Sequence, residues 1–136
     1  MELIDKIAGT EWAWAHALWQ SRWGFHVFPS SEQKRNIEEI AQVLQTIKGY
    51  FCKPVVITSW LRCQPYNSMI RGKVNSQHIK GGAIDFSIEG VDCGLVRDVL
   101  QSKLVELKIR CENIPKADWV HIDNKAPNEA GRFFRP

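Results

Sequence analysis

The chain has 136 residues, one domain's worth of sequence, and its 44% hydrophobic and 24% charged residues are typical of a soluble globular protein. Its formal net charge of +3 fits a polyanionic partner such as cell wall but is too small to indicate nucleic acid. No apolar run approaches the ~20 residues of a membrane-spanning helix, and the first residues lack the basic start and apolar core of a secretion signal. We expect one domain over residues 1–136, made in the cytoplasm without a signal peptide, monomeric and not inserted in a membrane.

The N-terminal segment carries an aromatic stripe. Residues 9–20 predict a helix with Thr10 as its N-cap. Three tryptophans and one histidine recur there at helical spacing: Trp12, His16, Trp19 and Trp23. Tryptophans on such a face can stack on the sugar rings of a glycan or cover the core of a small domain, and the sequence leaves both uses open.

A longer helix and a strand follow. Ser30 and Gln33 fit a capping box, and apolar residues then keep a 3.6-residue period up to Gly49, which can cap the C-terminus. We assign this helix no chemistry. The β-branched residues 55–58 after it predict a buried central strand, which delivers Ser59 and Arg62 at its C-terminal end.

Shorter elements fill the rest of the chain. Residues 64–70 predict a short helix, and Asp92 caps a helix over residues 93–102 with four apolar residues facing inward: Leu95, Val96, Val99 and Leu100. Residues 106–110 predict a strand, Pro115 interrupts the chain before the last strand, and residues 124–136 show no periodicity. The four cysteines form no CxxC pair, so we expect free, buried thiols rather than disulfides or a zinc–thiolate site.

Two stretches with period-two alternation place polar side chains on one face of a sheet. From Ala83 on, Asp85 lies on the face opposite to the apolar residues, and His121 does the same in a second strand over residues 119–123. If these strands pair, the two side chains lie together, and the turn that Gly81–Gly82 permits can bring His78 back toward Asp85. Two imidazoles and one carboxylate, with a fourth position left for water, form a catalytic zinc site. Spacing alone equally allows a loop histidine, a turn aspartate and a core histidine.

The residues that form this pattern also resemble a known family. The segment Ser76-x-His78-x-x-Gly81-x-Ala83-x-Asp85, with a later Asp118-x-x-His121, resembles the zinc D-Ala-D-Ala peptidase family. That family includes phage L-alanyl-D-glutamate endolysins and shares its fold with the N-terminal domain of hedgehog proteins. Upstream, residues 54–59 with Arg62 and Asn67 resemble the family's PVxITSGYR…N segment, although Trp60 and Leu61 replace the usual Gly and Tyr.

The resemblance implies a role for each matched residue. His78, Asp85 and His121 hold one zinc ion, and Asp118 is either the general base that takes the proton of the attacking water or a solvated aspartate of a turn. Because residues 118 and 121 of one straight strand face opposite ways, Asp118 must belong to the turn after Pro115, and Glu112 is the alternative base. Arg62 binds a substrate carbonyl or carboxylate, or forms a surface salt bridge. Ser76 hydrogen-bonds substrate or caps its loop, and Asp123 is a supporting carboxylate rather than a ligand.

The resemblance implies an α+β fold, in which a small antiparallel sheet carries the metal and helices pack on one side. It implies a zinc peptidase that cuts peptidoglycan stem peptides, either as an endolysin-like endopeptidase or as a D-Ala-D-Ala carboxypeptidase. The alternative is a zinc-stabilised cell-wall-binding module without turnover, which would not need the acidic base. Without a signal peptide, the enzyme would reach the wall through a holin or in a virion.

Overall fold

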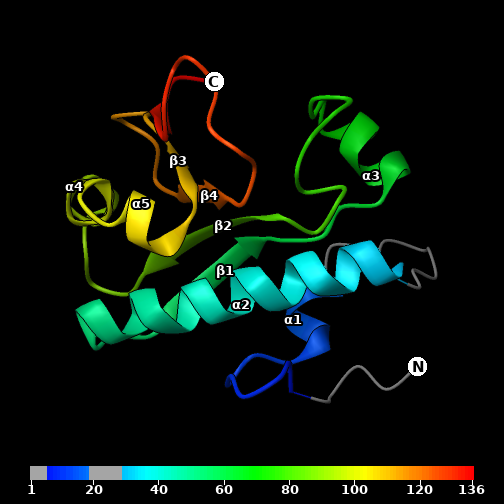
Figure 1. Ribbon diagram of the computed structural model, residues 1–136, viewed down its shortest axis with the longest axis horizontal. Helices are drawn as coiled ribbons and strands as arrows, with labels where there is room; N and C mark the ends of the chain where they lie inside the picture. The colour runs from blue at the N-terminus through cyan, green and yellow to red at the C-terminus, as the bar shows by residue number, and fades with distance from the viewer. Residues whose placement is uncertain (1–5, 19–28) are drawn as a thin grey trace.

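The computed structural model describes residues 6–18 and 29–136, whose strands form one five-stranded sheet (Figure 1). The strand order is β1 (Val55–Ser59), β2 (Ala83–Ile88), β4 (Val120–Asp123), β3 (Arg110–Glu112) and β5 (Phe133–Phe134). Neighbouring strands are antiparallel except that β5 runs parallel to β3. The predicted α+β fold is therefore confirmed, and β2 and β4 occupy the interior of the sheet.

One face of the sheet is apolar and carries the helices. The side chains of Ile84, Phe86, Val120 and Ile122 are fully buried and belong to the same core as residues of α2 (Ser31–Phe51) and α4 (Cys93–Gln101). Because side chains alternate along a strand, Asp85 and His121 are left on the opposite face. The core thus fixes which residues of β2 and β4 are available for chemistry.

The helix α2 begins as the sequence predicts and ends later. Ser30 and Gln33 form both hydrogen bonds of the capping box. The helix continues past Gly49 to Phe51, and Cys52 is the C-cap, with a left-handed φ of 51°. The prediction that Gly49 caps the helix was therefore wrong. The amide of Cys52 donates a hydrogen bond to the carbonyl of Lys48, which adds one more turn.

The N-terminal helix begins later than predicted. In the described residues the helix α1 covers Trp14–Leu18, so Thr10 lies too far before it to be its cap. The Thr10 hydroxyl accepts the amide of Trp12 and donates to the carbonyl of Ile7. The His16 ring accepts the amide of Ala13 at the helix start. Trp12 is 5% exposed and contacts His16 edge-on, which fits the core-covering reading of the aromatic stripe. Trp19 and Trp23 lie outside the described residues.

Two predictions about strands were wrong, and one strand was not predicted. β1 lies at one edge of the sheet, although its β-branched sequence predicted a central strand. The predicted strand over residues 106–110 begins in the helix α5 (Leu104–Leu107), and the chain becomes extended only from Arg110. In the tail without periodicity, two phenylalanines form β5 beside β3. Short strands give too few residues for a period to be recognised, and the neighbouring strand decides their conformation.

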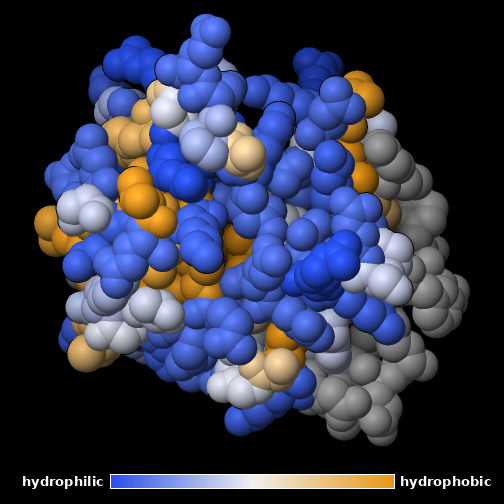
Figure 2. Space-filling view, viewed as in Figure 1, coloured by the Kyte–Doolittle hydropathy of each residue, from blue (hydrophilic) through white to orange (hydrophobic). Residues whose placement is uncertain are grey.

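The helices α3 (Gln64–Met69) and α4 lie close to their predicted positions, and Asp92 caps α4 through two amides. Leu95 is 53% exposed rather than buried, and the buried face of α4 contains Arg97 instead. Leu95 and Val105 are exposed. Figure 2 shows apolar surface over the region of α4 and α5 on an otherwise mostly hydrophilic face. All four cysteines are free, as expected, but Cys111 alone is buried and Cys52 is exposed. No helix in the described residues is long and apolar enough to cross a bilayer.

Candidate metal centre

Two of the three predicted ligands face each other across neighbouring strands. β2 and β4 are antiparallel, and their register places Asp85 directly opposite His121. Both side chains point away from the core, as the alternation in each strand predicts. Directly opposed residues have Cβ atoms about 5 Å apart, so the pairing alone brings the carboxylate and the imidazole into contact.

The third predicted ligand, His78, arrives on a turn that glycines make possible. Gly81 has a positive φ of 77°, and a Cβ there would lie 3.0 Å from the carbonyl oxygen of Gln33. At Gly82 a Cβ would lie 2.3 Å from the Asn124 side-chain oxygen. Gly81 is therefore required by its backbone conformation and by the carbonyl of Gln33, whereas a side chain at residue 82 would have to displace that of Asn124.

The helix α2 holds this turn in place. The Gln33 side chain closes the capping box with its oxygen, and its nitrogen donates to the carbonyl of Ile79 at 2.9 Å. Three residues further along α2, Asn36 donates to the carbonyl of Lys80 at 3.0 Å. The sequence assigned α2 no chemistry, but its first turns set the position of the loop that carries His78.

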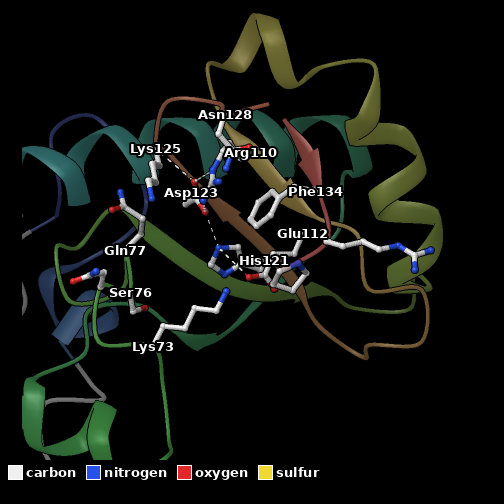
Figure 3. A pocket seen from close by; sticks show the side chains of 13 residues that line it. Lys73, Ser76, Gln77, Arg110, Glu112, His121, Asp123, Lys125, Asn128 and Phe134 are labelled. Atoms are coloured by element: carbon white, nitrogen blue, oxygen red, sulfur yellow. Dashed lines mark hydrogen bonds and ion pairs between the residues drawn. The ribbon is translucent and has the colours of Figure 1, made fainter. Parts of the chain in front are cut away.

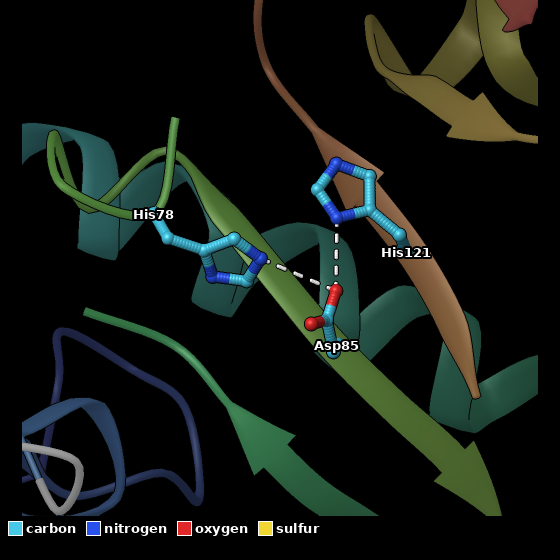
Figure 4. A group of neighbouring side chains, drawn as sticks. All are labelled: His78, Asp85 and His121. Carbon is cyan, nitrogen blue, oxygen red and sulfur yellow. Dashed lines mark hydrogen bonds and ion pairs between the residues drawn. The ribbon is translucent and has the colours of Figure 1, made fainter. Parts of the chain in front are cut away.

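The three side chains converge on one point (Figure 4). One carboxylate oxygen of Asp85 lies 3.2 Å from Nε2 of His78 and 2.8 Å from Nδ1 of His121. One ligand atom from each residue lies within 4.8 Å of the others. Two nitrogens and one carboxylate oxygen at this separation are a donor set for zinc that leaves one tetrahedral position open.

In each histidine, the ring nitrogen that faces away from Asp85 (the outer nitrogen) also has a hydrogen-bond partner. Such partners are expected for histidines that bind a metal, so they show whether the site fits one. Nδ1 of His78 lies 2.8 Å from the Trp60 carbonyl and donates its proton to it, which directs Nε2 toward Asp85, where it is placed to bind a metal. Nε2 of His121 lies 2.9 Å from Asp123, which directs Nδ1 inward. Metal-binding histidines commonly donate their second N–H to a carbonyl or a carboxylate in this way. The residues present therefore fit zinc.

Asp123 is in turn fixed by a buried arginine. Arg110 on β3 donates to both Asp123 oxygens, at 2.8 and 2.9 Å, and Asp123 is 1% exposed. The ring of Phe134 on β5 lies 4.0 Å from the guanidinium carbon of Arg110. Sequence reasoning identified Asp123 as a supporting carboxylate but missed Arg110, because the strand that carries it was predicted to end at that residue.

Hydrogen bonds set the charges of the centre when no metal is present. Burial opposes ionisation of Asp85, but hydrogen bonds from His121 and His78 hold its pKa well below its ordinary value. Burial also favours a neutral His121, but Asp123 and Asp85 raise its pKa to about 9. The pKa of Asp123 is lowered, against burial, by His121 and Arg110. Zinc binding below about pH 9 must therefore displace a proton from His121.

Arg62 and Ser76 both reach the centre. The Arg62 guanidinium lies 3.4 Å from the second oxygen of Asp85, and it also contacts Ser59 and Asn67. It is a partly buried side chain of the site rather than a surface salt bridge. The Ser76 hydroxyl accepts the amide of His78 at 3.2 Å, so it caps the loop while it lines the adjoining cavities.

Asp118, the predicted base, does not line the two cavities beside the three predicted ligands. It is exposed in a bend. Arg97, 4% exposed on α4, donates to three carbonyls of this loop: Pro115, Ala117 and Trp119. The loop is thereby held against the start of α4, where the pKa of the Cys93 thiol is raised mainly by burial, against Arg97, and further by Asp92 and Asp118.

Glu112 is the acidic residue beside the ligands. Its carboxylate lies 3.8 Å from Nε2 of His121 and lines both adjoining cavities. One cavity of about 400 Å³ contains the three ligands, Arg62 and Trp119. A second, of about 260 Å³, lies on the Asp123 side of His121 (Figure 3). The two cavities share four lining residues, so they meet at the metal centre: Lys73, Ser76, Glu112 and His121.

Comparison with known proteins gives one match. The profile of a family described as Peptidase M15 matches residues 17–123. The matched region contains the three ligands, Arg62, Glu112 and Asp123, and it ends before β5. No curated protein and no solved structure matches the chain.

Proposed function

The chain belongs to the peptidase M15 family of zinc peptidases, and on that premise we propose that it hydrolyses peptide bonds in peptidoglycan stem peptides. The observation that supports this most is the convergence of His78, Asp85 and His121, with the outer nitrogen of each histidine already held. Zinc bound there would supply water activation and polarisation of the scissile carbonyl. The two cavities that meet at this point give an extended peptide room on either side.

We assign the general base to Glu112. A base must come within hydrogen-bonding reach of the attacking water, and Glu112 borders the cavity that contains the ligands. Asp118 fits the family spacing, but its loop is held on the side of α4. Glu112 accepts the proton of the water and can return it to the leaving amine.

Arg62 and Ser76 contribute to substrate binding in this proposal. The Arg62 guanidinium holds one oxygen of Asp85 and so keeps the other directed at both histidines. Because it also lines the larger cavity, it is placed to stabilise the negative charge that develops on the substrate carbonyl oxygen. The Ser76 oxygen accepts a backbone amide, so its hydroxyl proton remains available to a substrate carbonyl.

Two finer properties belong to the same proposal. We favour an endolysin-like cut within the stem peptide over removal of its terminal D-alanine, with action at the cell wall after holin- or virion-type delivery. We also propose that the protein works as a monomer. The alternative, a zinc-stabilised wall-binding module without turnover, would need neither a general base nor two cavities that meet at the metal centre.

The test combines metal analysis with digestion of defined muropeptides. We expect about one zinc per chain in the parent, and loss of zinc in both His78→Ala and His121→Ala. Glu112→Gln should keep its zinc and lose ~10²–10⁴-fold in turnover, whereas Asp118→Asn should keep both. Mass spectrometry should find new amino groups and no new reducing sugars. Reducing ends without new amines would refute the peptidase, and a normal rate in Glu112→Gln would refute the assignment of the base.

A further inference from the structure

The second cavity includes polar and basic side chains that the catalytic proposal does not use. Lys73 comes from the loop before His78, and Lys125 follows β4 directly. Figure 3 shows both lysines extending into this space, Lys73 toward His121 and Lys125 toward Gln77. Within the described parts of the chain, neither lysine forms an ion pair with another residue.

The cavity is cationic because Asp123, one of the two acidic side chains that line it, is already paired with Arg110. Asp123 is neutralised by two hydrogen bonds from Arg110 and faces His121. Glu112 stands on the boundary shared with the larger cavity. Asn128 uses its side-chain oxygen to accept the amide of Ala130, which leaves its NH₂ group as a donor. Two ammonium groups and an amide donor thus surround a space that contains no unengaged acid apart from Glu112.

We propose that this cavity is a subsite for a substrate carboxylate that flanks the scissile bond. The proposal rests on the peptidase function and adds the chemistry that the enzyme selects. An ammonium group is a strongly hydrated point charge with freely rotating donors, and it binds a carboxylate without requiring one fixed orientation. The cavity meets the metal centre at Lys73 and His121, so a carboxylate held there lies close to the bond that is cut. Two carboxylates can supply it: that of the glutamyl residue, or the C-terminal carboxylate of the stem.

The experiment compares peptides that differ in one charge. The zinc-loaded full chain is assayed on a stem peptide, on the same peptide with a glutamyl carboxamide, and on the same peptide with a C-terminal carboxamide. The test variant is Lys73→Met with Lys125→Met. The matched control is Lys34→Met with Lys53→Met, which removes the same charge from exposed lysines that line neither cavity.

We expect one of the two carboxamides to lower kcat/KM of the parent by about 10–100-fold, the range for losing a charge-assisted hydrogen bond. The carboxamide that does so identifies the carboxylate. The control variant should keep this preference, and the test variant should cleave the acid and the amide peptide at similar rates. Equal rates on all three peptides in the parent, or a preference that survives in the test variant, would overturn the subsite.

A binding measurement separates this proposal from the peptidase function. In NMR spectra of the zinc-loaded protein, glutarate should shift the backbone amides of Gln77, Lys125 and Asn128, and glutaramide should not. The Lys73→Met, Lys125→Met variant should lose these shifts, while any shift from glutarate at the metal, seen at His78, should remain. A protein that cleaves no stem peptide but shows these shifts would refute the function and keep the subsite. Their absence would refute the subsite whatever the activity.

Discussion

The protonation of His121 can be tested on the metal-free protein, because the fold ties it to stability. Asp123 and Asp85 raise the pKa of this ring from its ordinary 6.5 to about 9, against the effect of burial. A folded-state pKa above the unfolded value means that the protonated ring stabilises the fold. That contribution is fully present below about pH 6.5 and is lost as the pH rises through about 9.

The size of the effect follows from the same shift. One pKa unit corresponds to about 1.4 kcal/mol, so a rise from 6.5 to about 9 is worth about 3 kcal/mol of unfolding free energy. The His121 side chain is 10% exposed, so solvent screening reduces this little. Asp85 and Asp123 have lowered pKa values and stay ionised over this window, so neither carboxylate contributes to the change.

Urea unfolding of chelator-treated protein between pH 6 and pH 10 measures this, with His121→Gln as the comparison variant. The difference in unfolding free energy between parent and variant should fall by about 3 kcal/mol across the window. His16→Gln, at an exposed histidine of α1, should leave the pH slope unchanged. Zinc must displace the same proton, so the extra stability from saturating zinc should grow as the pH rises. A parent–variant difference that is flat with pH would mean that His121 is already neutral, and would refute the argument.

Three further predictions concern the residues that hold the site in place. Arg97→Met should lower the unfolding free energy by ~2–5 kcal/mol, because three loop carbonyls lose a buried donor, and denaturant unfolding with no change would refute that role. Asp123→Asn should weaken zinc binding ~10–100-fold at a pH above 9, where the His121 ring is neutral in both proteins. Chelator competition measures this, and Asp98→Asn, which removes an exposed charge of α4, should bind zinc as the parent does. Ser30→Ala should cost ~1 kcal/mol of stability through the capping box, and a thermal unfolding midpoint equal to that of the parent would contradict it.

The contacts among the three ligands followed from sequence because they depend on local rules. Alternation in β2 and β4 places Asp85 and His121 on one face whatever the rest of the chain does, and antiparallel pairing then puts them opposite each other. Glycine at residues 81 and 82 marks the turn that brings His78 back. The capping box at Ser30 could be predicted for the same reason, because it involves neighbours three residues apart.

Asp123 and Glu112 were named from the sequence, but the positions of other residues around the ligands could not be predicted, because contacts between distant segments decide them. The direction of the loop before β4 depends on Arg97, a charged residue whose burial no helical period indicates. Sequence spacing therefore favoured Asp118 as the base, whereas the fold places Glu112 at the cavity. Likewise Arg110 gains its role only because β3 pairs with β4 and brings the guanidinium beside Asp123.

The metal ligands and the groups that surround them are carried by different parts of the sheet. Asp85 and His121 lie on the two strands β2 and β4. These strands pair with each other, and their opposite faces pack against one apolar core. Glu112 and Arg110 lie on β3, whose outer neighbour is the two-residue strand β5, beyond the region that matches the family. The packing of Phe134 on Arg110 therefore links the C-terminal segment to Asp123 and, through it, to His121. It follows that a change in β5 should act on the orientation of His121 and on Glu112 before it disturbs the contact between Asp85 and His78, so activity should be more sensitive than folding to this edge of the sheet.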